Sequence, residues 1–460
     1  MEKYLGNKSS LLPLIDAFLQ SRAPKAKSLS DPFAGTTNVS RYFRTRGWNT
    51  AACDANRFSY VLAHSYLGTD HAPSFLGVRK TSFDKARLPI LRREFERSVA
   101  KVGSLYLPDQ EPVEALQSLE SLSRVLASLQ SIGELNRKPG AITNYFSQWG
   151  KRSGYASLRG TVGNRNYFSK ANSLFLDGVL QTIREWFVND LISPSETFML
   201  LTSVLEEVVI TANVNGTFHD FNRDRIWPNA EQSFFLRVPL ISCTDTKTEI
   251  INADATSATA AFGRYDVCYL DPPYNFRQYS AYYHFLNFIA AYPFLPNVEA
   301  YLDEITHVRG QNPKDDFASD FCYRDKFVGA LRRLIDNADC EHVVLSYYGG
   351  RNHWNHWSRV DTPTDEGLRI ISSVFEDQTL FSSSEIVPTL DIRKNYQSRG
   401  GEQKALVNEY LFHGVRRVRR RRSPPDSALS LQANDRFGLS NIFRPVVIGP
   451  AEPRRLLAVG

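Results

Sequence analysis

The sequence is poor in cysteine and has no long uncharged apolar segment. Its five cysteines are an odd number without a Cys-x-x-Cys pair, so neither a disulfide framework nor a zinc knuckle is expected, and no metal is predicted. The apolar runs stop well short of the roughly 20 residues that a bilayer span needs. The first residues also lack the apolar core of a signal peptide. We therefore expect a cytoplasmic protein with reduced thiols and no membrane contact.

The chain is long and apolar enough to bury more than one layer of structure. It has 460 residues, of which 42% are hydrophobic, and this exceeds the size of one average domain. We expect one main domain together with a sizeable insertion or an appended module.

Positive charge is concentrated in one tract. The formal net charge is +6, and six arginines lie close together: Arg416, Arg417, Arg419, Arg420, Arg421 and Arg422. Guanidinium groups repel one another and are costly to bury unpaired. The tract is therefore either a solvated arm or a surface that neutralises nucleic-acid phosphates. Only the other features described below favour the second interpretation.

The first 70 residues predict the opening of a doubly wound α/β sheet. Ser28–Phe33 is a strand-like run that leads into a glycine-containing loop, and Thr50–Asp54 is a second one. Residues at helical spacing follow each run, the second helix being expected over Arg57–Tyr66. A strand-loop-helix-strand-helix start is typical of a Rossmann-like sheet with helices on both faces.

The pattern changes twice after that. From Asp70 to about Asn213 helical periodicity dominates, which predicts an inserted, largely helical region. Strand-like runs return at Glu249–Ala253, Tyr265–Leu270, His342–Tyr347, Ser384–Leu390 and Ala405–Phe412, the last two as in a long hairpin. We therefore divide the chain into two parts of a sheet domain (1–70 and 216–414), an insertion (71–215) and a basic tail (415–460).

Asp271-Pro272-Pro273-Tyr274 directly follows the run Tyr265–Leu270. Ligands bind at the carboxyl ends of strands in an open α/β sheet, and two prolines end the strand and fix the backbone. The resulting platform suits an exocyclic amine such as adenine N6. Asp271 and the Pro272 carbonyl can accept its two N–H hydrogens, and Tyr274 can stack on a base that has left the duplex. An ordinary turn after a strand is the alternative.

A second motif, Asp31-Pro32-Phe33-Ala34-Gly35-Thr36, lies at the first strand-to-helix turn. Gly35 lets the backbone approach a ligand closely, and the following helix amino terminus favours a carboxylate such as that of a methionine moiety. Asp54 ends the next strand-like run, where an acidic side chain can accept from both hydroxyls of a ribose. One such loop is a weak signal alone, but with the amine platform it predicts S-adenosylmethionine as methyl donor.

The order of the motifs resembles the class D12 N6-adenine-specific DNA methyltransferases. Tyr4-Leu5-Gly6-Asn7-Lys8 is similar to the amino-terminal motif of that family, which precedes the glycine loop, with Asp-Pro-Pro-Tyr last. The continuation Asn275-x-Arg277-Gln278-Tyr279 resembles one subgroup. Shorter segments resemble the same subgroup: Asn166–Ser169 with Asn172, Asp177 and Arg184, then Ala212-Asn213, Asn252–Ala255 and Leu345–Tyr347.

The resemblance implies a sequence-specific adenine N6 methyltransferase, the modification arm of a restriction–modification or related defence system. Double-stranded DNA is then the expected partner, with a cognate endonuclease or another subunit of that system as a second. The resemblance implies that Gly6 and Lys8 close over the methionine end of the cofactor and that Asp254 lies near its adenine. The expected cofactor-binding residues are Tyr4, Gly6, Lys8, Asp31, Phe33, Gly35, Thr36, Asp54, Asp254 and Ala255.

One position departs from the family pattern. Thr37 stands where the family usually has a second glycine. A β-branched residue is tolerated there only if its φ is negative, so a negative φ is expected at this position.

Target reading is assigned to the insertion and to the residues after the catalytic motif. The stretch Asn144–Tyr167 mixes arginines with aromatic and amide side chains, which can contact base edges or stack. A basic surface loop explains that stretch equally well. The expected DNA-binding residues are Asn275, Arg277, Gln278, Tyr279, Arg152, Arg159 and Arg165. Tyr279 can instead pack a helix against the sheet, and His284 is expected to be a structural hydrogen-bonder rather than a general base.

Two other functions remain open at this point. The same chemistry could act on RNA adenine or on cytosine N4, although the amino-terminal position of the Tyr4–Lys8 motif argues against it. The chain could also be a DNA-binding subunit that has lost catalysis. The intact residues Asp271, Tyr274 and Asp54 argue against that alternative.

Overall fold

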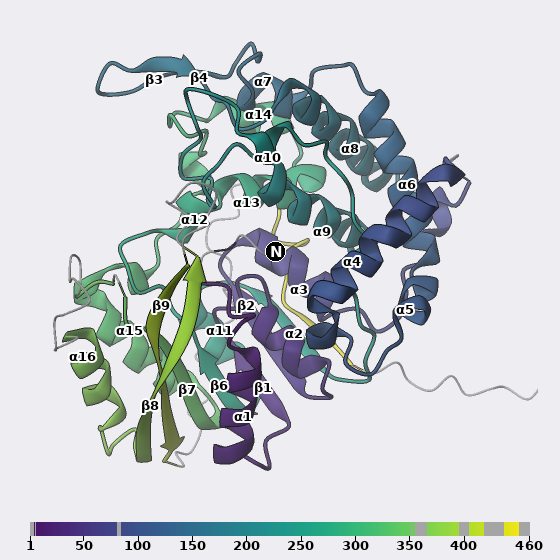
Figure 1. Cartoon of the computed structure of the whole chain (residues 1–460). Coiled ribbons are helices and arrows are strands. Elements are labelled where there is room, and N and C mark those ends of the chain that lie inside the picture. Colours follow the sequence, from purple (N-terminus) through teal and green to yellow (C-terminus); the bar gives the residue numbers. More distant parts are fainter. Residues whose placement is uncertain are drawn as a thin grey trace, which may run out of the picture.

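The computed structural model describes residues 4, 6–80, 84–350, 352–354, 366–394, 404–417 and 437–449. They form an eight-stranded sheet with helices on both faces and a larger helical region beside it (Figure 1). The fold is therefore α/β, as the sequence predicts.

The sheet has the strand order β10-β5-β2-β1-β6-β7-β9-β8. Its strands are β1 (Ser28–Asp31), β2 (Asn49–Asp54), β5 (Thr248–Asn252), β6 (Tyr265–Leu270), β7 (Cys340–Tyr348), β8 (Phe381–Lys394), β9 (Lys404–Arg416) and β10 (Val446–Ile448). The adjacent strands β5, β2, β1, β6 and β7 run parallel to one another. At the two edges, β10 pairs antiparallel with β5, and the β8–β9 hairpin pairs antiparallel with β7.

Successive strands are added on opposite sides of β1. β2 and β5 lie on one side of it, and β6 and β7 lie on the other. β1 pairs with β2 on one side and with β6, which follows much later in the chain, on the other. A reversal of this kind opens a crevice at the carboxyl ends of the two strands, where ligands bind in open α/β sheets. Asp31 ends β1 and Asp271 follows β6, so both motifs predicted from the sequence meet at this crevice.

Two sets of helices cover the sheet. Helices α1 (Leu12–Arg22), α2 (Asn38–Arg44) and α3 (Arg57–Tyr66) lie on one face, and α11 (Ala255–Ala261), α15 (Arg324–Asn337) and α16 (Glu366–Phe375) lie on the other. On the first face, apolar residues of α1 at helical spacing pack against Val267 and Tyr269 of β6. The intervening residues Cys268 and Leu270 pack on the second face, because side chains alternate along a strand.

The predicted elements of the sheet are confirmed with small changes at their ends. β6 and α3 have the predicted bounds. β1 ends at Asp31 rather than Phe33, because Pro32 and Phe33 already belong to the turn toward α2. The two hairpin strands are longer than predicted, since the ladder continues through the polar residues up to Lys394 and from Lys404.

The helical region lies between α3 and β5 in the chain. It contains α4 (Leu88–Tyr106), α5 (Pro112–Ser118), α6 (Glu120–Leu135), α7 (Ala141–Phe146), α8 (Lys170–Val188), α9 (Pro194–Thr211) and α10 (Pro228–Glu231), with turns η1 (Leu76–Val78) and η2 (Lys85–Arg87) and a hairpin of β3 (Gly154–Ala156) and β4 (Val162–Asn164). Ser193 and Glu196 form a capping box at the start of α9. Among the described residues, no helix is both long and apolar enough to cross a membrane.

A second group of helices, after β6, packs against the same region. It comprises α12 (Tyr279–Tyr282), α13 (His284–Ala291) and α14 (Val298–Asp303), with turns η3 (Tyr292–Phe294), η4 (Pro313–Asp315) and η5 (Asp320–Cys322). α13 packs against both α3 and α9, so one apolar core runs from the sheet into the helical region. Sequence periodicity did not indicate this docking.

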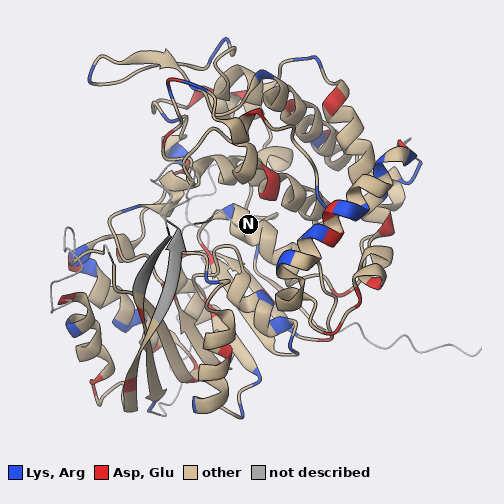
Figure 2. Ribbon diagram, viewed as in Figure 1, with Lys and Arg blue, Asp and Glu red and all other residues tan. Residues whose placement is uncertain are grey.

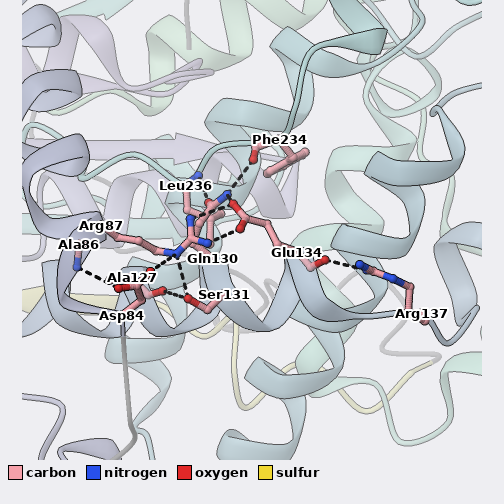
Figure 3. A network of polar contacts seen from close by, with 10 residues as sticks. All are labelled: Asp84, Ala86, Arg87, Ala127, Gln130, Ser131, Glu134, Arg137, Phe234 and Leu236. Atoms are coloured by element: carbon pink, nitrogen blue, oxygen red, sulfur yellow. Dashed lines mark hydrogen bonds and ion pairs between the residues drawn. The ribbon is translucent and has the colours of Figure 1, made fainter.

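Buried amides hold the irregular segments of the helical region in place. Gln130 on α6 donates to the carbonyl of Phe234 at 3.0 Å and accepts from the N–H of Leu236 at 2.9 Å (Figure 3). At the side of this contact, Arg87 pairs with Glu134. The segment between α10 and β5 is thereby fixed to α6 without forming regular secondary structure of its own.

Residues 437–449 return to the edge of the sheet. β10 extends the sheet beside β5, and Leu439 and Phe443 are buried in the main core. The hydroxyl of Tyr60 on α3 donates to the carbonyl of Arg444 at 2.6 Å. No pattern in the sequence after Gly414 predicted an ordered segment here.

Candidate active site

A cavity of about 1210 Å³ lies at the carboxyl ends of the parallel strands. Its walls come from the loops after β1, β2, β5 and β6, the segment before α1, residues 313–319 and residues 439–445. All ten residues predicted to bind the cofactor line this cavity, and so do the four residues of the Asp-Pro-Pro-Tyr motif. The fold thus brings together residues that are spread over most of the sequence.

The loop after β1 is shaped by Gly35. This residue has a φ of 51°, and its N–H donates to Asp54 Oδ2 at 2.9 Å. A Cβ at position 35 would lie 3.1 Å from Cε1 of Tyr4. The Tyr4 ring is itself held by stacking on Tyr283, with ring centroids 4.6 Å apart. Both the backbone conformation and the space above it therefore require glycine.

Asp31 is buried beneath this loop. Its carboxylate accepts from the Ser40 hydroxyl at 2.9 Å and from the N–H of Phe33 at 3.3 Å. Burial, together with the nearby carboxylate of Asp271, raises the pKa of Asp31 to about 7. Two acidic groups thus share the crevice, which makes it favourable for a cation.

Asp54 and Asp254 contribute to the cavity in different ways. The Asp54 carboxylate accepts from Gly35 and, at 2.8 and 2.9 Å, from the main chain and side chain of Asn56. It therefore ties the loop after β1 to the end of β2. Asp254 is exposed and caps α11 by accepting from the N–H of Thr256 at 2.9 Å. Asp254 has more room for a further donor than Asp54 has.

Thr37 adopts the conformation that the sequence did not lead us to expect. Its φ is 63°, in the left-handed region, at the residue that precedes α2. The expectation of a negative φ was wrong because the N–H of Thr37 bonds to the carbonyl of Ala34 at 2.6 Å, which closes the loop tightly. The side chain is fully buried and its hydroxyl has no hydrogen-bond partner. Thr37 thus adopts a backbone conformation that glycine, the usual residue of the family here, would adopt more easily, and the loop is locally strained.

A buried lysine joins the catalytic motif to the sheet. The Lys8 ammonium lies 3.2 Å from Asp271 Oδ1 and is also paired with Glu409 on β9. The side chains of Lys8 and Glu409 are only 4% and 0% exposed, whereas Asp271 is 21% exposed and faces the cavity. In this structure the ammonium contacts two carboxylates, which places Lys8 on the side of the cavity that the Asp-Pro-Pro-Tyr motif forms.

Tyr274 packs into the core beneath the cavity wall. Its ring meets Tyr347 edge-on at 5.1 Å and Phe327 at 6.1 Å, and its carbonyl accepts from the N–H of His353 at 2.7 Å. Burial raises the pKa of Tyr274 well above its usual value, so the phenol stays neutral. The residue lines the cavity, but its hydroxyl is buried and has no hydrogen-bond partner in the structure.

The residues after the motif form the mouth of the cavity. Asn275, Phe276, Arg277 and Tyr279 line it, and the Phe276 side chain is 62% exposed. The Asn275 side chain accepts from the N–H of Arg277 at 3.0 Å, which fixes the turn. Gln278 accepts from the N–H of Ser319 at 2.9 Å and so joins this turn to the segment 313–319.

The three arginines predicted to contact DNA lie in three different environments. Arg152 pairs with Asp303 and with Tyr145 at the surface. Arg165 is 4% exposed, and its guanidinium donates to main-chain carbonyls of residues 307 and 308 at 3.0 Å. Arg159 is exposed in the loop of the β3–β4 hairpin, which projects from the helical region with basic positions at its tip (Figure 2). Among the three, Arg159 is the one presented to solvent without a protein partner.

His284 has the structural role expected from the sequence. Burial lowers its pKa to about 3, and its Nε2 lies 3.0 Å from the carbonyl of Phe218. A neutral imidazole in this position is a hydrogen-bond donor that links α13 to the segment between α9 and α10.

Several residues of the site were missed by sequence reasoning. The cavity wall includes Leu439, Phe443 and Arg444 from the segment before β10, and Arg57, which pairs with Asp315. Glu409 could have been suspected, because a charged residue inside an otherwise apolar strand-like run indicates a buried partner. Nothing in the sequence marked the residues before β10. Of the arginine tract, Arg416 and Arg417 are described, and the others lie outside the described residues.

Comparison with known proteins finds relatives over most of the chain. The family model described as D12 class N6 adenine-specific DNA methyltransferase matches residues 4–149 and 141–314. The chain is 26% identical to the type II methyltransferase M.NlaIII of Neisseria lactamica over 393 residues, which are 84% of this chain and 90% of that protein. It is 25% identical to the modification methylase StsI of Streptococcus sanguinis and 23% identical to the type II methyltransferase M.FokI of Planomicrobium okeanokoites. Those two matches cover 89% of this chain but only 51% and 52% of the relatives.

Proposed function

The chain belongs to the D12 class of N6 adenine-specific DNA methyltransferases, and from this premise we propose that it methylates N6 of an adenine swung out of a defined duplex sequence. S-adenosylmethionine is the proposed methyl donor. The relatives named as type II methyltransferases support a role as the modification enzyme of a restriction–modification system, with a cognate endonuclease as functional partner.

The observation that carries the proposal is the position of Asp271. It follows the strand next to β1, lies 3.2 Å from Lys8 and faces the cavity that the cofactor loop also lines. A carboxylate held at this place can accept one N–H hydrogen of an adenine amine, and the carbonyl of Pro272 can accept the other. Both contacts help to localise the lone pair on N6, which the ring otherwise withdraws.

The cavity fits S-adenosylmethionine by its chemistry. The carboxyl groups of Asp31 and Asp271 favour a cationic centre, and the amino terminus of α2 is proposed to favour the carboxylate of the cofactor. Gly35 forms a surface that a Cβ would fill, the Asp54 carboxylate is the proposed acceptor for the ribose hydroxyls, and the exposed Asp254 is proposed to lie near the adenine. When bound, this cofactor supplies an electrophilic methyl group on sulfur. Residues of the cavity would hold it in contact with the target amine, and this positioning would supply much of the reduction in the barrier.

The size of the cavity supports two ligands. Small-molecule sites commonly measure about 300–1,000 Å³, whereas this cavity measures about 1210 Å³. A flipped nucleotide is proposed to enter past the exposed ring of Phe276 and the side chain of Arg277. Tyr274, which lines the cavity, is the residue proposed to contact its base.

DNA contacts are proposed at two places. Asn275, Arg277 and Tyr279 at the mouth would hold the target nucleotide and its neighbours, and Gln278 would position them through Ser319. Arg159 on the β3–β4 hairpin would reach the duplex at a distance from the cavity, with Arg152 as a second basic group. Arg165 is proposed to keep the base of the hairpin in place through its carbonyl contacts.

The proposal is tested by methyl transfer from labelled S-adenosylmethionine to duplex DNA, followed by digestion to nucleosides. N6-methyl-2′-deoxyadenosine is the expected product, and Asp271→Ala is expected to abolish it while still binding the cofactor in a calorimetric titration. A methylated cytosine, or a preference for RNA, would replace the proposal by the corresponding alternative. DNA binding by the wild-type chain without any transfer would identify an inactive subunit.

A further inference from the structure

Glu409 is the most deeply buried charged group around the cavity, and the family match, which ends at residue 314, does not include it. It lies on β9, opposite Tyr348 of β7 and Thr389 of β8, in the middle of a hairpin ladder. Glutamate is disfavoured in strands, and a buried carboxylate without partners is costly. Its presence at this position therefore requires an explanation from its contacts.

The contacts of Glu409 lead to the catalytic carboxylate. Its Oε1 accepts from the Ser346 hydroxyl on β7 at 2.6 Å and is paired with the Lys8 ammonium. The same ammonium lies 3.2 Å from Asp271 Oδ1. One lysine thus links a carboxylate that has no solvent contact to the carboxylate that faces the cavity.

The alternation of side chains explains why these groups meet. Tyr269 on β6 and Leu411 on β9 belong to the face of the sheet that α1 covers. Asp271 and Glu409 are each two residues from one of these positions, so both are directed to the same face. Lys8 immediately precedes α1 and reaches this face at the carboxyl edge of the sheet.

The segment that carries Lys8 is held independently of its ammonium. Asn7 Oδ1 accepts from the N–H of Ser9 at 2.9 Å and from the side chain of Asn38 on α2 at 2.8 Å. The carbonyl of Lys8 accepts from the N–H of Leu11 at 2.8 Å. The backbone is fixed by these contacts, and the orientation of the four-carbon stem then depends on the carboxylates that the ammonium meets.

We propose that Glu409 is a positioning residue for methyl transfer: it anchors the Lys8 ammonium, and the anchored ammonium holds the Asp271 carboxylate in the orientation in which it accepts a hydrogen of the target amine. The inference rests on the proposed function, because it assigns the acceptor role to Asp271. It attributes to Glu409 no contact with cofactor or DNA. Ser346 donates to the same Glu409 Oε1 atom that pairs with Lys8.

The decisive variant is Glu409→Gln, which keeps the shape of the side chain and removes its charge. We expect kcat at saturating S-adenosylmethionine and DNA to fall on the order of tenfold to a hundredfold, since small misplacements of reacting groups have effects of this size. KM for both substrates and calorimetric cofactor affinity should stay within about twofold, because no binding contact is lost. Glu409→Asp, which keeps the charge, should recover most of kcat.

The matched control is Glu385→Gln. Glu385 is a carboxylate of the same hairpin, on β8, but it pairs with Arg22 at the surface and does not line the cavity. It should have wild-type kcat and KM. If Glu409→Gln does not fold, Ser346→Ala removes the second contact of the Glu409 carboxylate without changing any charge. That variant should lower kcat several-fold at unchanged KM.

Three results would overturn the proposal. Wild-type kcat in Glu409→Gln or in Ser346→Ala would show that Lys8 and Asp271 need no anchor. A raised KM for the cofactor with normal kcat would assign Glu409 to cofactor binding. Equal losses in the Gln and Asp variants, with weakened cofactor affinity, would assign it to packing. If the wild-type chain methylated a base other than adenine, the proposed function would fail, and the same kcat comparison would still judge Glu409.

Discussion

The sheet and the helical region both bury many polar side chains, but they use them differently. In the helical region these groups are hydrogen-bonded to the backbone. The Asp177 carboxylate, for example, accepts from the N–H groups of Gly140, Ile142 and Thr143 at 2.7 to 3.0 Å. At the carboxyl edge of the sheet, buried polar residues such as Asp31 and Lys8 line a cavity instead. The first set holds the fold together, and the second set is available for ligands.

This difference changes the meaning of the sequence motifs. Asn172, Asp177 and Arg184 belong to the subgroup pattern recognised in the sequence, yet each bonds to main-chain groups of a neighbouring segment. Asn213 does the same with four residues around it. In the helical region the pattern therefore marks residues that anchor loops, whereas its segment Asn252–Ala255 lines the cavity.

The largest effect is expected from Asp271→Asn. Removal of one charged acceptor from the cavity should lower kcat on the order of a thousandfold. The free energy of unfolding should change by less than about 1 kcal/mol, because Lys8 keeps its pairing with Glu409. Single-turnover transfer and urea denaturation measure the two quantities. A strongly destabilised variant would contradict the distinction between the two regions.

Asp177→Ala should have the opposite signature. Three buried N–H groups would lose their acceptor, and each unsatisfied group costs about 1–3 kcal/mol. Because local relaxation reduces this cost, the free energy of unfolding should fall by roughly 3–5 kcal/mol. Urea denaturation gives this value. Asp303→Ala, which removes an exposed carboxylate from the same region, should leave the denaturation midpoint unchanged.

The pH dependence of stability should report on Asp31. Its folded pKa is about 7, while its unfolded pKa is about 3.9. Between these values the folded chain binds a proton that the unfolded chain lacks. Stability therefore falls as pH rises from about 4 to about 7, by at most about 1.4 kcal/mol per pH unit, and levels off above. Asp31→Asn should lose less stability than wild type between pH 5.5 and pH 8 in thermal denaturation. Parallel curves would refute the raised pKa.

Thr37→Gly should stabilise the protein by about 1 kcal/mol. The change relieves a left-handed backbone conformation and removes a buried unpartnered hydroxyl, and these gains exceed the loss of one methyl group. Thr45, at the other end of α2, has a φ of −67° and bonds to the carbonyl of Tyr42. Thr45→Gly should therefore destabilise. The thermal midpoints of both variants test this, and a lower midpoint for Thr37→Gly would show that the side chain packs productively.

The smallest effect is expected at Arg159. If the hairpin contacts phosphates, Arg159→Ala should weaken duplex binding a few-fold and reduce the slope of log affinity against log salt by about 1. Arg165→Ala should instead lower stability, because its guanidinium holds carbonyls of residues 307 and 308. Fluorescence anisotropy over a range of salt concentrations distinguishes them. An unchanged slope for Arg159→Ala would remove the hairpin from the DNA interface.

The parts of the molecule that were predictable from sequence are local. β6, α3 and the loop after β1 follow from an apolar run, a helical spacing and a turn, and the residues that meet at the cavity follow from strand ends. What could not be predicted depends on contacts between distant segments. The pairing of Lys8 with Glu409, the docking of α13 on α9 and the packing of Phe443 have no local signature. The positive φ of Thr37 was also missed, since it is imposed by the closing of the loop.

The strand order has a consequence for how the protein is made. Ser28 and Asp266, which are hydrogen-bonded neighbours at the start of β1 and β6, are 238 positions apart. At a synthesis rate of roughly 5–20 residues per second, β1 waits on the order of ten to fifty seconds for its second neighbour. Contacts in the helical region span shorter stretches of chain and close faster. When the helical region between α3 and β5 has been made, six of the eight strands of the sheet are still to come, so the crevice between β1 and β6 forms after it.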